Sequence, residues 1–328
     1  MNHSYKEPPQ AIDAVIAWVD GNDPLHSKKM RQYLSNNEQQ HEDIAGPTRF
    51  RSIGEITYCV ASILRFAPFI RRIFIITDQQ QPNLQGMVER NFPGEEHKIT
   101  LVDHLELYQG YEQYLPVFNS MSIETVTWRI KDLSEHYIYF NDDVFLVRPT
   151  RPSDWFVENN IIAYGNYRSM LLDGLVSWLK PKKNGKKPLG YKDTQIAAAK
   201  VLGKRDTYFH FEHTPHPLKK SVFKDYFDNH PAIFEKNCAF KFRDPAQFNP
   251  QSLYYLLMLK ANRAIIQQPR LLYIKPVGRG KGYISRKLKA FEKDPSIKFA
   301  CFGSMDLANE SDAQFLLNWL ARQLSITL

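Results

Sequence analysis

The segment IDAVIAWVD (residues 12–20) decides the fold class, because it is an apolar run that ends in polar residues. Its length and composition are typical of a buried β-strand. The GNDP sequence at 21–24 then predicts a turn. RRIFIITD (71–78) has the same form, again with an aspartate at its end, and HKITLVD (97–103) predicts a third strand.

Helical patterns separate these strands. SKKMRQYLSNNEQQHED (27–43) predicts a polar surface helix, and SIGEITYCVASILRFAP (52–68) has apolar residues at helical spacing. NSMSIETVTWRI (119–130) predicts another helix, and HYIYFNDDVFLV (136–147) a further strand. This alternation predicts an α/β, Rossmann-like fold with a mostly parallel sheet flanked by helices. Ligands of such sheets bind at the carboxyl ends of the strands.

Two lysine-rich stretches and a terminal helix complete the predicted organisation. WLKPKKNGKKPLGYK (178–192) predicts a mobile basic loop within a lid insertion at about 170–210. KPVGRGKGYISRK (275–287) predicts a second basic loop; its three glycines lack the context of a phosphate-binding loop. We expect one catalytic domain over 1–270. Residues 271–328, which include the amphipathic helix DAQFLLNWLARQL, are expected to pack on that domain.

Composition limits the possible partners and compartments. The chain has 328 residues and a net charge of +8 (43 − 35), which favours anionic partners. No nucleic-acid-binding motif is present, so nucleic acid is not an expected partner. No apolar run reaches the roughly 20 residues of a membrane span, and the first ten residues resemble no signal peptide. Three widely spaced cysteines predict neither a zinc site nor disulfides. These features together predict a cytoplasmic protein.

The NDD sequence at 141–143 interrupts an apolar run with two adjacent carboxylates. Asn and Asp are ordinary turn formers, so a plain turn is one interpretation. The other is a cation site, because two ionised carboxylates in a buried strand are costly unless they are paired or bind metal. Mg²⁺ typically takes one or two carboxylates together with substrate phosphate oxygens. On a strand, adjacent side chains would point to opposite faces of the sheet.

HTPHPLKKS (213–221) places two histidines among prolines, which prevent a helix. A rigid histidine suits a general base, because its ordinary pKa of about 6.5 lies near working pH. A surface turn with incidental histidines is the alternative.

Arg49 and Arg51 precede a predicted helix and would suit a phosphate clamp. Tyr254 and Tyr255 follow KFRD (241–244) and are expected in the core.

Four segments together resemble the conserved regions of the Stealth proteins, in the family's order. They are IDAVIAWVDGNDP (12–24), RFRSIGEITYCVASILRFAPFIRRIFIITD (49–78), LPVFNSMSIETVTWRIKDLSEHYIYFNDDVF (115–145) and HTPHPLKKS (213–221). Stealth proteins are sugar-1-phosphate transferases, and bacterial members build phosphodiester-linked surface polysaccharides. The resemblance therefore implies a bacterial capsular or exopolysaccharide phosphotransferase.

The resemblance also implies roles for particular residues. Glu124 and Asp143 match acidic residues regarded as catalytic or metal-binding, His213 matches the proposed catalytic histidine, and Arg243 matches an arginine at the donor phosphates. Asp142 and Asp143 are the expected ligands of Mg²⁺ or Mn²⁺. The expected donor-binding residues are Asp20, Gly21, Asn22, Asp23, Arg49, Arg51 and Asn119. Trp128 and Met121 depart from the family's usual pattern, which bears on acceptor specificity.

The reaction implied is transfer of a hexose- or N-acetylhexosamine-1-phosphate from a UDP-sugar to a sugar hydroxyl, with release of UMP. UDP-N-acetylhexosamine is the expected donor. The acceptor is an oligo- or polysaccharide, free or lipid-linked, and a lipid-linked acceptor would place the protein peripherally at the inner membrane face. One alternative is a metal-dependent glycosyltransferase that attacks the anomeric carbon and releases UDP. A non-catalytic protein that binds anionic polysaccharide through its basic loops is the other.

Overall fold

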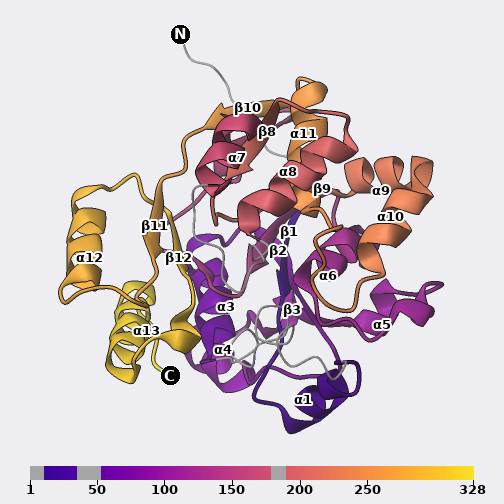
Figure 1. The fold of residues 1–328 in the computed structure, drawn as a ribbon. Coiled ribbons are helices and arrows are strands. Elements are labelled where there is room, and N and C mark those ends of the chain that lie inside the picture. Colours follow the sequence, from indigo (N-terminus) through magenta and orange to yellow (C-terminus); the bar gives the residue numbers. More distant parts are fainter. Residues whose placement is uncertain (1–10, 35–52, 179–189) are drawn as a thin grey trace.

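A computed structural model describes residues 11–34, 53–178 and 190–328 (Figure 1). Its central sheet has five strands in the order β3-β2-β1-β4-β9. β1, β2, β3 and β4 pair in parallel, whereas β9 is antiparallel to β4. The strands are β1 (Ile12–Ala17), β2 (Ile70–Thr77), β3 (Ile99–Asp103), β4 (His136–Asn141) and β9 (His216–Lys219). The prediction of an α/β fold with a mostly parallel sheet is confirmed.

β1 is the middle of this sheet because its side chains are buried on both faces, as parallel strands covered by helices require. Ile16 pairs with Ile75 on one side and with Phe140 on the other, and all three side chains are fully buried. The carboxyl ends of β1, β2 and β4 consequently meet at one edge. The chain segments that follow these three strands are therefore neighbours.

Helices cover both sides of the sheet. In Figure 1, α3 and α13 lie on one side of β1–β3, and α6, α9 and α10 lie on the other. The helices are α1 (Pro24–Arg31), α3 (Glu55–Phe66), α4 (Gln85–Asn91), α5 (His104–Leu107), α6 (Ser120–Val126), α7 (Met170–Trp178), α8 (Tyr191–Val201), α9 (Lys220–Asn229), α10 (Pro231–Cys238), α11 (Pro250–Lys260), α12 (Tyr283–Lys293) and α13 (Glu310–Leu324). Among the described residues no helix is long and apolar enough to cross a membrane.

The apolar flanks of the NDD sequence predict a single strand that NDD interrupts, but the structure has two separate strands here. β4 ends at Asn141, Asp142 and Asp143 form a turn, and β5 (Val144–Leu146) joins a different sheet. There β5 pairs antiparallel with β12 (Phe299–Phe302), which pairs in turn with β11 (Leu271–Ile274). The turn interpretation is thus correct for the backbone. The expectation that the two carboxylates point to opposite faces of one strand no longer applies.

A third sheet, absent from the sequence prediction, is built around the long strand β7 (Asn160–Ser169). β7 pairs with β6 (Phe156–Val157), β8 (Thr207–Phe211) and β10 (Ala264–Gln267). α7, α8 and part of β8 occupy the region predicted as a lid insertion, and residues 179–189 of the predicted basic loop lie outside the described residues. The lid and the division at residue 270 stay predictions.

Two other predicted elements change at their ends. α1 begins at Pro24 rather than residue 27, because the Asp23 carboxylate accepts a hydrogen bond from the Leu25 amide (2.8 Å) as an N-cap. It ends at Arg31, and residues 35–43 of the predicted helix are not described. α12 begins inside the predicted 275–287 loop.

The C-terminal helix α13 packs on the protein body, as predicted from its amphipathic pattern. Leu316, Leu320 and Leu324 are fully buried, while Phe315 at the margin of this face stays 44% exposed. The Arg65 side chain on α3 donates a hydrogen bond to the Leu324 carbonyl (3.0 Å). Residues from the two ends of the sequence therefore share one hydrophobic core.

An ion pair between the buried Asp13 carboxylate and the partly exposed Arg71 guanidinium connects β1 to its neighbours. The Asp13 side chain is completely buried and accepts two hydrogen bonds from the Arg71 guanidinium (2.9 and 2.7 Å). It also accepts the Ser134 amide (2.7 Å), while Arg71 donates to the Asp132 carbonyl (2.7 Å). A single carboxylate thus joins β1, β2 and the turn that leads into β4.

We expect Arg71→Ala to lower the free energy of unfolding by about 3 kcal/mol, because it leaves the Asp13 carboxylate buried without its counter-ion. Chemical denaturation of the purified variant measures this loss. Lys224→Ala, which breaks the exposed Lys224–Asp228 pair on α9, is the matched control and should leave the midpoint unchanged. Equal effects of the two substitutions would show that the Asp13 pair does not stabilise the sheet.

Candidate active site

Asp142 and Asp143 form a half-buried acidic turn at the carboxyl end of β4. The Asp143 carbonyl accepts the Phe302 amide (3.1 Å), and the Cys301 thiol lies 3.7 Å from the Asp143 carboxylate. The turn is therefore held between the central sheet and the sheet that contains β12. Two adjacent carboxylates are fixed in place at the edge where a ligand is expected.

Burial dominates the electrostatics of this turn. It raises the pKa of Asp143 to about 6, and it raises the pKa of Asp142 well above its ordinary value. The negative charge of Glu55, the first residue of α3, raises both further, and the Asp143 charge adds to the effect on Asp142. Three carboxylates thus share a desolvated region in which their charges repel one another.

This donor set fits a divalent cation bound together with substrate phosphates. A cation between Asp142 and Asp143 would offset the desolvation and the repulsion that together raise their pKa values. Within the described ranges no group of three His, Cys, Asp or Glu side chains forms a closed metal cluster. Two carboxylates with the remaining positions left to phosphate oxygens and water is the arrangement that Mg²⁺ usually adopts.

Glu124 lies on α6, which ends against the same strand. Its side chain is buried, one carboxylate oxygen accepts the Tyr139 hydroxyl (3.3 Å), and the other has no hydrogen-bond partner. Burial raises its pKa, and the positive charge of Arg243 opposes that shift. Burial raises the pKa of Tyr139, and the charges of Glu124, Asp142 and Asp143 add to that shift.

Arg243 is exposed, and its guanidinium donates a hydrogen bond to the Ser120 hydroxyl (3.2 Å) at the start of α6. Asn119, the N-cap of that helix, is buried and donates to the Phe242 carbonyl (3.1 Å) and to Gln247 Oε1 (2.6 Å). The Asn119 side-chain amide therefore donates its hydrogen bonds to groups within the protein. It positions the loop that carries Arg243, and its predicted contact with a donor stays a prediction.

His213 is held between two tyrosine rings. Its ring stacks on Tyr191 at 4.6 Å and on Tyr273 at 5.6 Å between centroids. Burial lowers its pKa, so the imidazole is neutral at neutral pH and able to accept a proton. Burial raises the pKa of both tyrosines, and the charge of Asp143 adds to the shift of Tyr273 while that of Glu124 adds to the shift of Tyr191. Tyr273 on β11 pairs with Cys301 on β12, whose thiol lies 3.7 Å from the Asp143 carboxylate, so His213 and Asp143 lie beside the same pair of strands.

His216, the second histidine of the HTPH segment, belongs to the core. It is 4% exposed, its Nδ1 lies 3.1 Å from the Tyr255 hydroxyl, and burial lowers its pKa to about 3. Tyr254 and Tyr255 are fully buried, as predicted. Only His213 of this segment is placed to react.

The turn after β1, predicted to receive the nucleotide, is fastened to the segment after β2 by Gln80. The Gln80 amide exchanges two hydrogen bonds with the Asp20 backbone (2.9 Å each) and donates another to the Asp23 carboxylate (2.9 Å). This last bond lowers the pKa of Asp23. Gly21 and Asn22 lie in the turn itself, where the Asn22 amide donates to Asp20 (2.9 Å).

Two predicted donor residues, Arg49 and Arg51, lie outside the described residues. Sequence reasoning in turn missed Glu55, Gln80, Tyr139, Tyr191 and Tyr273, which surround or hold the predicted groups. No local pattern distinguishes these five from ordinary surface or core residues. The only sequence signal for any of them is a position within the segments that resemble Stealth regions, which include Glu55 and Tyr139.

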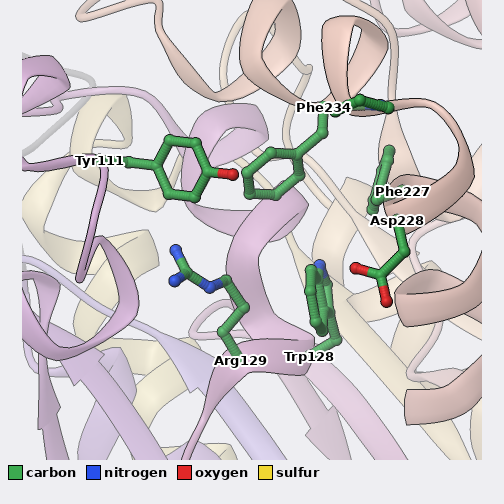
Figure 2. Close-up of a pocket in the computed structure, with 7 residues that line it drawn as sticks. Tyr111, Trp128, Arg129, Phe227, Asp228 and Phe234 are labelled. Atoms are coloured by element: carbon green, nitrogen blue, oxygen red, sulfur yellow. The ribbon is translucent and has the colours of Figure 1, made fainter.

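A further cavity lies away from these residues. It has a volume of about 390 Å³ and is lined by Tyr111, Trp128, Arg129, Phe227, Asp228, Pro231 and Phe234 (Figure 2). Its two charged side chains are already engaged, since Arg129 donates to the Leu107 and Gln109 carbonyls (2.7 and 2.5 Å) and Asp228 pairs with Lys224, whereas the Trp128 indole nitrogen has no hydrogen-bond partner among the described residues. None of the predicted catalytic residues lines it.

Comparison with known families matches two parts of the chain. The model of Stealth protein conserved region 1 matches residues 10–38, and that of Stealth protein conserved region 2 matches residues 49–164. The second match contains Glu124 and the acidic turn. His213 and Arg243 lie beyond both matches.

Curated relatives extend the similarity over most of the chain. An exopolysaccharide phosphotransferase of Streptomyces coelicolor is 33% identical over 247 residues, which are 74% of this chain and 43% of that protein. The receptor polysaccharide phosphotransferase WefC of Streptococcus oralis is 28% identical over 79% of this chain and 81% of its own length. The chain spans less than half of the first relative.

Among solved structures, galactosyltransferase LgtC in complex with donor and acceptor sugar analogs is similar, at 11% identity and a TM-score of 0.49. The match covers 96% of each chain.

We expect Asp143→Asn to stabilise the metal-free protein at pH 7, by up to about 3 kcal/mol. The folded-state pKa of about 6 exceeds the ordinary 3.8, so the stability that protonation provides is present below pH 4 and lost as pH rises through 6. Thermal unfolding between pH 4 and pH 8 should show the advantage of the variant shrinking toward acid. A variant no more stable than the wild-type protein at pH 7 would contradict the electrostatic description.

Proposed function

This chain belongs to the Stealth protein family, and we propose that it transfers a sugar-1-phosphate from a nucleotide-sugar to a saccharide hydroxyl. The observation that supports the proposal is that β11 and β12 contact both Asp143 and His213: the Cys301 thiol lies 3.7 Å from the Asp143 carboxylate, and its strand partner Tyr273 stacks on His213 at 5.6 Å between centroids. The named polysaccharide phosphotransferases among its relatives support the same reaction class. A UDP-hexose or UDP-N-acetylhexosamine is the proposed donor, and a growing capsular or surface polysaccharide is the proposed acceptor.

His213 acts as the general base in this proposal. Its neutral imidazole takes the proton of the acceptor hydroxyl, and the acceptor oxygen attacks the phosphorus that bears the sugar. UMP leaves, and the sugar C1–O bond stays intact, so the anomeric configuration of the transferred sugar is kept. Stacking between Tyr191 and Tyr273 holds the imidazole plane, which limits the directions from which the acceptor can approach.

The remaining residues bind charge, which is the main requirement of phosphoryl transfer. Asp142 and Asp143 would hold Mg²⁺ or Mn²⁺, which when bound supplies positive charge to the diphosphate. Arg243, and Arg49 or Arg51, take up charge on the phosphoryl oxygens. Glu124 has one buried oxygen without a partner, which makes it the group that can orient the acceptor hydroxyl.

The leaving nucleotide tests the proposed reaction. Incubation with a UDP-sugar, Mg²⁺ and short capsule fragments should release UMP and give a phosphodiester product. Asp143→Asn should reduce this turnover at least about 100-fold, because one ligand of the cation is lost. Release of UDP would instead indicate a glycosyltransferase that attacks the anomeric carbon. Undiminished turnover in Asp143→Asn or in excess chelator would rule out the cation site.

His213→Ala should reduce kcat by about 10²–10⁴-fold, the usual contribution of a general base. Donor affinity should change little, because the imidazole contacts the acceptor in this mechanism. Steady-state kinetics and donor titration measure the two effects separately. His230→Ala, at an exposed histidine after α9, is the control and should behave as the wild-type enzyme. A His213→Ala enzyme with near wild-type kcat would require another base.

A further inference from the structure

α7 exposes a cluster of leucines on its outer face. The side chains of Leu171, Leu172 and Leu175 are 80%, 67% and 58% exposed. Positions i, i+1 and i+4 lie on one side of a helix, so the three form a continuous apolar strip. Single exposed leucines are normal on a protein surface, whereas a contiguous group marks a surface that binds a partner or a membrane.

The orientation of α7 is fixed by its acidic residue, which faces the protein. Asp173 accepts hydrogen bonds from the Tyr208 hydroxyl (2.6 Å) and from Lys192 (2.9 Å). Turning the leucines inward would break both contacts and expose Asp173 in their place. The described part of the helix therefore places Asp173 and Met170 against the body and three leucines in solvent, whereas an ordinary surface helix buries its apolar residues.

The chain on either side of this helix is basic. Arg168 on β7 precedes it, and the eight residues 180–187 that follow in the sequence contain five lysines. The whole chain carries a net charge of +8. An apolar helical face followed in the sequence by a cluster of lysines is the pattern of helices that lie in the interface of anionic membranes. A neutral protein partner would need the leucines but not the charge.

We propose that the leucine strip of α7 docks on an anionic membrane surface, with the three side chains inserted at the level of the lipid head groups. The functional role of this docking rests on the proposed function, because a lipid-linked saccharide acceptor is presented at such a surface. The docking itself requires neither donor nor turnover.

The contacts of α7 also connect the proposed docking face to the reaction centre. Lys192, which pairs with Asp173, is the neighbour in sequence of Tyr191, whose ring stacks on His213. Both belong to the first turn of α8. Docking through α7 would therefore hold the general base near the membrane surface, where the hydroxyl of a lipid-linked acceptor lies.

Vesicle flotation of the full chain tests the proposal. We expect the wild-type protein to float with vesicles of equal parts phosphatidylcholine and phosphatidylglycerol and to bind pure phosphatidylcholine far less. The combined variant Leu171→Ser, Leu172→Ser, Leu175→Ser should bind the anionic vesicles at least about tenfold less. The matched control, Leu105→Ser with Leu307→Ser, removes two leucines that are 52% and 48% exposed elsewhere and should bind as the wild type does.

Three results would overturn the proposal. One is wild-type protein that stays unbound to anionic vesicles, and a second is equal binding by the triple variant. The third is a wild-type dimer that the triple variant converts to monomer without any effect on vesicle binding, which would assign the leucines to a second copy of the chain. Thermal unfolding verifies that the triple variant is folded. Turnover with a soluble acceptor, expected to be unchanged in the triple variant, tests the enzyme separately from its docking.

Discussion

The desolvation of the carboxylates at the end of β4 is the constraint on which the candidate site depends. Burial raises the pKa values of Asp142 and Asp143, the charge of Glu55 raises both further, and the charge of Asp143 adds to the shift of Asp142. Such an arrangement lowers the stability of the protein alone. The arrangement becomes favourable only when a ligand supplies positive charge, so the acidic turn favours binding and does not stabilise the fold.

The sequence could predict the central sheet because the signals for its strands and helices lie in short stretches of neighbouring residues. Apolar runs that end in aspartates, separated by amphipathic helices, predict parallel strands whose carboxyl ends meet at one edge. β1, β2, β3 and β4 appear within these runs, although β1 ends at Ala17, before the predicted end at residue 20, and β4 ends at Asn141, before the predicted end at residue 147. The resemblance to a known family added Glu124, Asp143, His213 and Arg243, which no periodicity distinguishes from other polar residues.

What the sequence could not predict depends on long-range pairing. β5 continues the apolar run of β4, yet it pairs with β12, where Val144 meets Cys301. The tyrosines that enclose His213 come from α8 and β11, far from it and from each other along the chain. Neither relation leaves a periodic signal, because strand partners and ring contacts are decided by packing of the whole fold.

The pairing of β5 with β12 has a consequence for dissecting this protein. The acidic turn lies within the family-matched segment 49–164, but its walls include Cys301 and Tyr273 from the last sixty residues. A minimal catalytic fragment therefore cannot be cut at the border of the matched regions. Any shortened chain that omits β11 and β12 would leave an unpaired strand edge beside the two aspartates and open the reaction centre to bulk water.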